Sequence, residues 1–159
     1  MKIIHTDGDN KDFYSICQQL DKSLNENVPG RTEAGVNSVF DSGNIQDVFL
    51  LYDGDKAIGS ACFWQHDDVE CELIRVFICA EYRGRGLAGK LVGEVEKLAT
   101  VKGYKKIMLR TFSSTPYAVR AYEKVGFKKT PPSEIKYTDK YAKVLALSKL
   151  RVYMVKNLI

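Results

Sequence analysis

A run of arginines and glycines, Arg83-Gly84-Arg85-Gly86-Leu87-Ala88-Gly89, has residue types and spacing that could do chemistry. Glycines let the backbone turn tightly and bring its N–H groups close to a ligand. Arg83, Arg85 and the nearby Lys90 add full positive charges. A helix that begins here would also point its partly positive N-terminus at the same place. The run therefore predicts a site for an anion, best a phosphate or pyrophosphate. The alternative is a surface loop whose glycines only turn the chain.

Two regular elements flank this run. Leu73 to Cys79 is apolar except for Arg75 and rich in β-branched and aromatic residues, which indicates a buried strand. From Leu87 the apolar residues recur at helical spacing along one stripe, and Gly103 supplies a left-handed stop. A strand, a glycine turn and a helix start therefore coincide, which favours a binding turn over a plain loop.

The glycines of this run also match the dinucleotide-binding pattern G-x-G-x-x-G. That pattern requires an acidic residue about 20 positions further on, at the end of the next strand, to bind the ribose hydroxyls. Here the next predicted strand, residues 106–111, ends in Arg110 and Thr111. A kinase glycine loop is rejected as well, because no H-R-D or D-F-G sequence follows.

The same letters fit R-x-x-G-x-A, as Arg83, Gly86 and Ala88, directly after an apolar strand. Residues 121–127 then read A-Y-E-K-V-G-F. With these two motifs in this order, the chain strongly resembles the GNAT superfamily of acyl-CoA-dependent N-acetyltransferases over about residues 45–129. The resemblance implies an enzyme of the GNAT-like acyl-CoA N-acyltransferase fold that uses acetyl-CoA as co-substrate.

The resemblance also implies where the coenzyme would bind. Backbone groups of residues 76–78 would pair with the pantetheine arm and polarise the acyl carbonyl, while residues 84–89 would hold the pyrophosphate. The predicted coenzyme-binding residues are Val76, Phe77, Ile78, Arg83, Gly84, Arg85, Gly86, Leu87, Ala88, Gly89 and Thr115.

Two of the implied roles concern single side chains. Tyr122 matches the family position whose hydroxyl approaches the coenzyme sulfur, so the resemblance makes it the candidate general acid; by itself, a helical Tyr is more often a packing residue. Thr115 stands where many relatives have an Asn that contacts the coenzyme. That contact would therefore be weaker, or Ser113 or Ser114 would make it.

Acetylation of an amine also needs a group that takes up a proton. Glu72 lies in the apolar strand just before the predicted crevice, where partial burial would suit it to accept a proton, directly or through water. In some members of the resembled family, a Glu at the matching place is the general base. Two alternatives stay open: Glu72 is a solvent-facing residue without a role, or Glu70, on the same face of the strand, is the base.

The whole chain, residues 1–159, reads as one α/β domain with a mixed sheet. Antiparallel N-terminal strands precede a β-α-β unit, whose strands 70–78 and 106–111 should be parallel. Ligands gather beyond the carboxyl ends of such strands, which is where the glycine turn lies. The expected strands are 2–6, 48–52, 57–66, 70–78, 106–111, 127–130 and 151–155, and the expected helices begin at Asp9 or Asn10, cover 31–41, 87–102 and 115–125, and begin again near 138.

Length and composition limit the class of protein. The 159 residues are 45% hydrophobic and 28% charged, which suits a single soluble domain. No apolar run approaches the roughly 18 residues of a membrane span, and the N-terminus lacks a signal-peptide core, so we expect a cytoplasmic protein without a membrane partner. Two histidines and four cysteines without C-x-x-C spacing argue against a metal site and predict buried free thiols, with a Cys–His nucleophile as a minor alternative.

The net charge of +4 is too small to argue for a nucleic-acid partner. Residues 134–159 carry six Lys or Arg against two acids, which equals the excess of the whole chain. This tail is either a solvated basic surface or a sign of an acidic acceptor or partner. The leading interpretation is an N-acetyltransferase for a primary amine of a small molecule or peptide. A non-catalytic acyl-CoA sensor and a basic interaction module are the alternatives, and a homodimer is left open.

Overall fold

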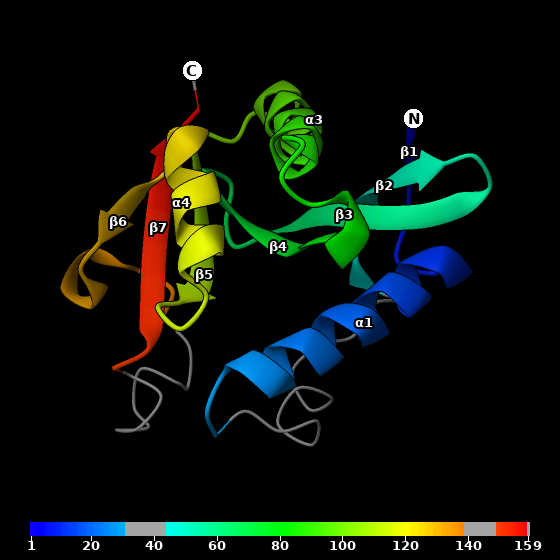
Figure 1. The fold of residues 1–159 in the computed structure, drawn as a ribbon. Helices are drawn as coiled ribbons and strands as arrows, with labels where there is room; N and C mark the ends of the chain where they lie inside the picture. Colours follow the sequence, from blue (N-terminus) through cyan, green and yellow to red (C-terminus); the bar gives the residue numbers. More distant parts are fainter. Residues whose placement is uncertain (31–43, 139–148, 159) are drawn as a thin grey trace.

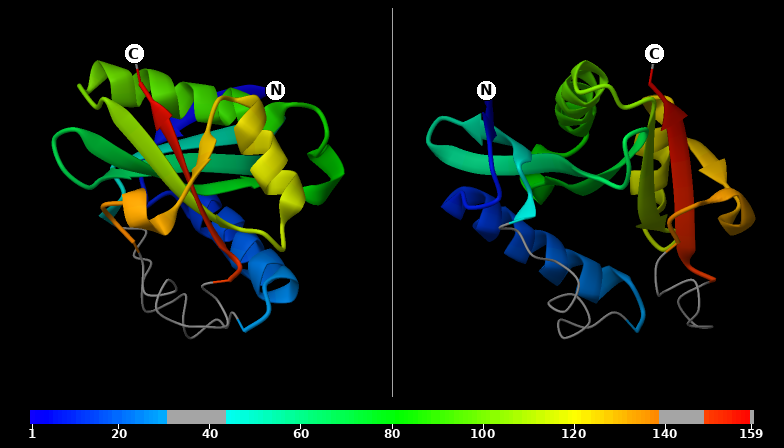
Figure 2. Two further views of the ribbon diagram at one scale, coloured as in Figure 1. Left: turned by 90° about the vertical axis from the view of Figure 1, so that its left-hand side faces the viewer. Right: turned by 180° about the vertical axis from the view of Figure 1, so that it is seen from behind.

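The computed structural model describes residues 1–30, 44–138 and 149–158 of the chain (Figure 1). They form one seven-stranded sheet in the order β1-β2-β3-β4-β5-β7-β6. Helix α1 crosses one face of the N-terminal strands and α3 lies on the other (Figure 2). The strands are β1 (Lys2–Thr6), β2 (Asp47–Asp53), β3 (Lys56–Gln65), β4 (Glu70–Ile78), β5 (Lys106–Phe112), β6 (Lys128–Thr130) and β7 (Arg151–Asn157). The helices are α1 (Lys11–Asn27), α3 (Leu87–Val101), α4 (Pro116–Lys124) and the short 3₁₀ turns η2 (Ala80–Tyr82) and η3 (Pro132–Glu134).

These elements confirm the predicted α/β class, with antiparallel strands β1 to β4 followed by a parallel β4-α3-β5 unit. Boundaries differ from the expected ones by one or two residues. The helix expected over 31–41 lies entirely outside the described residues. Most of the helix expected after residue 138 lies outside them as well. Within the described ranges, no helix has the length and hydropathy of a membrane span.

Helix α1 shows how local sequence sets an element. The side-chain oxygen of Asn10 accepts the backbone N–H groups of Asp12 and Phe13, at 2.8 and 3.2 Å. This satisfies donors that a helix start otherwise leaves without partners. The helix then buries an apolar face at three- and four-residue spacing, made of Phe13, Ile16, Cys17 and Leu20. The expected helix start at Asn10 is confirmed.

Strand β4 separates from β5 halfway along its length. Parallel pairing runs from Glu70 to Leu73 and then ends, whereas pairing with β3 continues as far as Ile78. Between these points Arg75 and Val76 together face a single residue of β3, so β4 contains a β-bulge. A bulge bends its strand and disrupts the ladder. The second half of β4 therefore turns an edge without a strand partner toward β5.

The bulge is held by side chains from both sides. Arg75 has φ of 54°, the only positive value outside glycine in the described chain. The hydroxyl of Ser60 donates to the Arg75 carbonyl at 2.7 Å, and the Arg75 guanidinium pairs with Asp21 of α1 at 2.5 Å. Such a backbone conformation persists only where its surroundings fix it. The opening between β4 and β5 is thus built into the packing of α1 and β3.

Candidate active site

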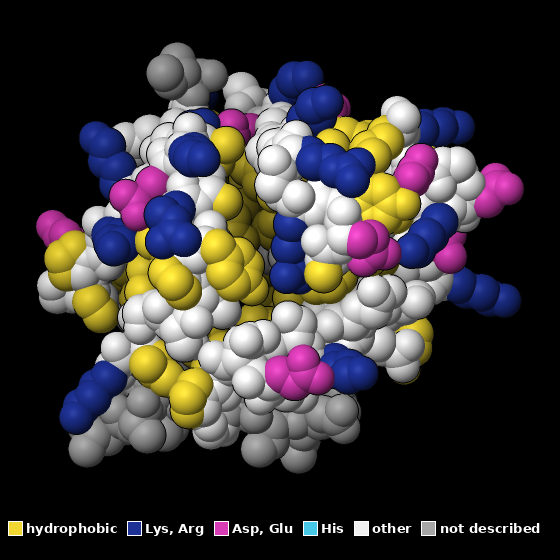
Figure 3. Space-filling view, in the orientation of Figure 1, with side chains coloured by type: hydrophobic (Ala, Val, Ile, Leu, Met, Phe, Trp, Pro, Cys, Tyr) yellow, Lys and Arg dark blue, Asp and Glu magenta, His cyan; other side chains and the backbone are white. Residues whose placement is uncertain are grey.

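A cleft of about 1220 Å³ opens where β4 and β5 separate. Figure 3 shows the hollow, with hydrophobic side chains in its walls and Lys and Arg around it. Its wall includes every predicted site residue except Arg85. The Arg85 guanidinium instead donates to the Glu81 carbonyl at 3.4 Å and lies over the Tyr82 ring. The fold thus gathers residues from β4, the glycine turn and α4 around one cavity.

The glycine turn contains left-handed backbone conformations, which glycine adopts more readily than any other residue. Gly84 and Gly86 have φ of 79° and 71°, and a Cβ added to either would meet no atom within 4 Å. Glycine is therefore needed here for its conformation and not for lack of space. Gly86 is the N-cap of α3, and no side chain caps this helix. The first N–H groups of α3 can consequently serve an anion at the cleft.

The open edge of β4 offers backbone groups to the cleft. The N–H of Cys79 donates to Ile58 of β3 at 2.8 Å, so by strand alternation the backbone groups of Ile78 point the other way. The carbonyl of Ile78 accepts the Nε of Arg83 at 2.8 Å, and the Arg83 guanidinium lies between the rings of Phe77 and Tyr117. Arg83 thus bridges the cleft from β4 to α4.

Tyr122 lies on α4 and forms part of the cleft wall. Its ring packs edge-on against Phe127, with centroids 6.0 Å apart. Burial raises the pKa of its hydroxyl above the ordinary value, so the hydroxyl is protonated at neutral pH. Thr115, the N-cap residue of α4, is buried and donates its hydroxyl to the Phe112 carbonyl at 2.9 Å. Ser113 and Ser114 do not belong to the wall.

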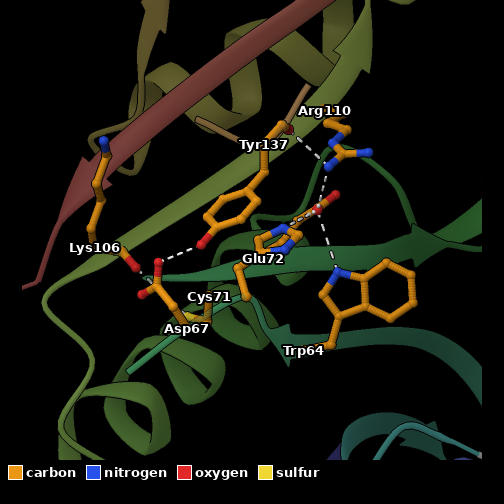
Figure 4. Close-up of polar contacts among 8 residues, drawn as sticks. Trp64, Asp67, Cys71, Glu72, Lys106, Arg110 and Tyr137 are labelled. Carbon is orange, nitrogen blue, oxygen red and sulfur yellow. Dashed lines mark hydrogen bonds and ion pairs between the residues drawn. The ribbon is translucent and has the colours of Figure 1, made fainter. Parts of the chain in front are cut away.

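Glu72 is buried, with 4% of its surface exposed, and it forms part of the cleft wall. Its Oε1 accepts Nε2 of His66 at 2.7 Å and Nε1 of Trp64 at 3.3 Å, and it pairs with Arg110 at 3.2 Å (Figure 4). The alternative of a solvent-facing glutamate is therefore wrong. Glu70 is buried too, but it does not reach the cleft.

Sequence reasoning missed the three partners of Glu72. Trp64 lies directly opposite Glu72 on β3, and Met108 lies opposite it on β5. Arg110 follows two residues after Met108, so it shares the same face of the sheet. Strand register was the signal that could have found Trp64 and Arg110. His66 follows β3 in the turn, where no register applies.

Positive charge predominates around the cleft. Glu72 is the one carboxylate among the described residues of the wall. The cations there are Arg75, Arg83, Arg110, Arg120, Lys124 and Arg151. No group of three or more His, Cys, Asp or Glu side chains in the described segments could hold a metal ion. All four cysteines are buried free thiols, as predicted.

Known proteins agree with this architecture. The sequence pattern of the Acetyltransferase (GNAT) family matches residues 17–127. A mycothiol acetyltransferase of Corynebacterium efficiens is 35% identical over 81 residues, which cover 51% of this chain and 27% of that relative. The chain thus spans about a quarter of the length of this relative.

Two solved structures show the same fold. An acetyltransferase from Streptococcus agalactiae superposes with a TM-score of 0.79 at 20% identity, over 98% of each chain. A GNAT family acetyltransferase from Elizabethkingia anophelis, solved with acetyl-CoA bound, gives a TM-score of 0.60 at 16% identity, over 80% of this chain and 84% of that one.

Proposed function

Because the chain belongs to the GNAT family of acetyltransferases, we propose that it transfers the acetyl group of acetyl-CoA to a primary amine of a small molecule or peptide. One observation carries the proposal: a single cleft contains a buried carboxylate, Glu72, a protonated phenol, Tyr122, and the open edge of β4. These are the parts that acyl transfer to an amine requires.

The coenzyme would lie along the open edge of β4. Its pyrophosphate fits the glycine turn and the N-terminus of α3, where Gly84 and Gly86 let the backbone approach. Its pantetheine arm would pair with backbone groups of residues 76–78. Arg83 now occupies the carbonyl of Ile78, so the arm would displace this side chain, and the released guanidinium would remain close to the phosphates.

The chemistry follows from the two side chains. The amine nitrogen attacks the thioester carbonyl, a C–N bond forms and the C–S bond breaks. Glu72 takes the proton that the amine loses, and backbone N–H groups of β4 stabilise the developing oxyanion. Tyr122 donates its hydroxyl proton to the leaving thiolate and recovers a proton from solvent. An acceptor would enter from the side of Glu72.

The experiment is a panel of acceptor amines with acetyl-CoA, followed by release of free thiol. Gly86→Asp should abolish thiol release and the rise in melting temperature that acetyl-CoA causes, because it adds a negative charge at the pyrophosphate site. Gly93→Asp is the matched control, since it adds the same charge to α3 away from its N-terminus.

Two outcomes would contradict the proposal. A folded Gly86→Asp protein that still binds acetyl-CoA would remove the glycine turn from the coenzyme site. Coenzyme binding by the native chain without thiol release across the panel would indicate a sensor and not an enzyme.

A further inference from the structure

We propose that His66 is a positioning residue for the general base: it holds the Glu72 carboxylate so that one oxygen faces the acceptor amine. The inference rests on the proposed acetyl transfer and adds a residue that does not belong to the cleft wall. His66 would act only through Glu72, because Glu72 belongs to the cleft wall and His66 does not.

The side-chain contacts of Glu72 are all made by one of its two carboxylate oxygens. Nε2 of His66, Nε1 of Trp64 and the Arg110 guanidinium all converge on Oε1. These donors come from the turn after β3, from β3 itself and from β5, so they hold the oxygen from several directions (Figure 4). A carboxylate tied at one oxygen presents the other in a fixed orientation. Oε2 is then the oxygen that an acceptor amine in the cleft would meet.

His66 is itself held in place by a chain of contacts. Its ring stacks on the Tyr137 ring, with centroids 4.2 Å apart and planes 9° from parallel. The Tyr137 hydroxyl donates to Asp67 at 2.5 Å, and Asp67 accepts the N–H groups of Val69 and Glu70 at 2.8 Å. The hydrogen bond from Tyr137 and these N–H groups hold the pKa of Asp67 well below its usual range. Asp67 therefore stays charged throughout the pH range of an assay.

The segment that holds His66 also holds Arg110, a second partner of Oε1. The backbone carbonyl of Tyr137 accepts the guanidinium of Arg110 at 2.9 Å, and Arg110 pairs with Glu72. Tyr137 thus orients both His66 and Arg110, which contact Oε1 of Glu72. A carboxylate that needed only burial would not require such a frame, whereas a base must be held near its productive geometry.

Three variants separate the hydrogen bond from packing. His66→Phe keeps a flat ring on Tyr137 but removes the donor, so kcat should fall about tenfold or more while the KM for acetyl-CoA is unchanged. His66→Gln restores an N–H at the same reach and should recover most of kcat. His5→Phe is the matched control, because His5 also stacks on a ring, Phe49, and contacts a carboxylate, Asp47, away from the cleft.

A second readout does not depend on turnover. Trp64 is the single tryptophan of the chain and shares Oε1 with His66. Loss of the His66 contact should change the surroundings of the indole, so Trp64 fluorescence should differ from the native value in His66→Phe, return close to it in His66→Gln and stay native in His5→Phe. This fluorescence pattern without thiol release by the native protein would leave the contact of His66 with Glu72 intact and remove the proposed acetyl transfer.

The positioning role is overturned if His66→Phe retains full kcat, or if Trp64 fluorescence in His66→Phe is the same as in the native protein. It is equally overturned if His66→Gln is as slow as His66→Phe, because restoring the donor would then not restore activity. Glu72→Gln combined with His66→Phe should be no slower than Glu72→Gln alone, and additive losses would count against the inference.

Discussion

The proposed mechanism gives opposite proton tasks to Glu72 and Tyr122, which lie in the wall of one cleft. Glu72 accepts donors at one oxygen, whereas the Tyr122 hydroxyl has its pKa raised by burial. A raised pKa means that the phenol keeps its proton as the solution becomes alkaline. The acid should therefore stay competent at pH values where most acceptor amines have already lost their proton.

Tyr122→Phe should lower kcat by roughly 10²-fold with little change in coenzyme affinity, because it removes the acid and keeps the ring. Since the native phenol is protonated across the range, this loss should be equally large at neutral and at alkaline pH. Rates of thiol release against pH measure it. Native activity in Tyr122→Phe would mean that the thiolate leaves without that hydroxyl.

Glu72→Gln should behave differently with pH. If Glu72 takes the amine proton, the variant should recover part of its activity in alkaline solution, where the acceptor is already neutral. The two pH profiles are best recorded side by side with the same acceptor. Full activity of Glu72→Gln at neutral pH would shift the base to water.

At the residue scale, the sequence predicted the candidate acid and base by their motif and position, but not the contacts that hold the base. Those contacts join residues on β3, β4 and β5 and the segment after η3. Such pairs depend on strand register and on a distant loop, and the apolar periodicity of one strand carries neither.

At the scale of elements, Gly59 controls how closely β3 approaches the end of β4. A Cβ at this position would lie 2.7 Å from the Ile78 side chain and 2.8 Å from the Phe77 carbonyl. The carbonyl oxygen of Phe77 belongs to the backbone, so it cannot move away without a shift of β4. The open edge of β4 therefore depends on the absence of a side chain from its neighbour.

Gly59→Ala should destabilise the protein by about 1–3 kcal/mol, as overpacking does, and should weaken acetyl-CoA binding by shifting residues 76–78. Gly93→Ala provides the control, since a Cβ there meets nothing and alanine favours the helix by about 0.5–1 kcal/mol. Thermal unfolding with and without acetyl-CoA measures both. Equal melting temperatures for the two variants would contradict the close contact.

Elements with strong periodicity were predictable, because buried faces repeat every second residue in a strand and every three or four in a helix. The β-bulge at Arg75 was not. It becomes visible only when β3 is laid against β4. The place of β7 between β5 and β6 was also beyond local reasoning, since antiparallel pairing of distant segments leaves no mark within either one.

At the scale of the whole molecule, charge is distributed unevenly around the cleft. Its wall holds one described carboxylate among several arginines and a lysine. A cleft lined by charges of one sign concentrates ligands of the opposite charge. An acyl-CoA carries several phosphate charges, so the protein's field should draw it in.

The KM for acetyl-CoA should therefore rise with ionic strength while kcat changes little, because salt screens exposed charges over about 10 Å at 0.1 M. Arg120→Gln, at the rim of the cleft, should reduce the dependence on salt. Initial rates at several salt concentrations measure this. A KM that does not respond to salt would show that the charges of the wall are already balanced.

The edge of β4 beyond Leu73, which has no strand partner on the side of β5, bears on the solubility of the protein. A strand that shows free N–H and C=O groups is a template on which another chain can add, and proteins guard such edges with charged side chains. Arg83 acts as this guard, since it covers the Ile78 carbonyl and spans to Tyr117. A coenzyme arm that pairs with β4 would complete the sheet in place of a missing strand. The small molecule would then protect the protein from aggregation as well as serve as its substrate.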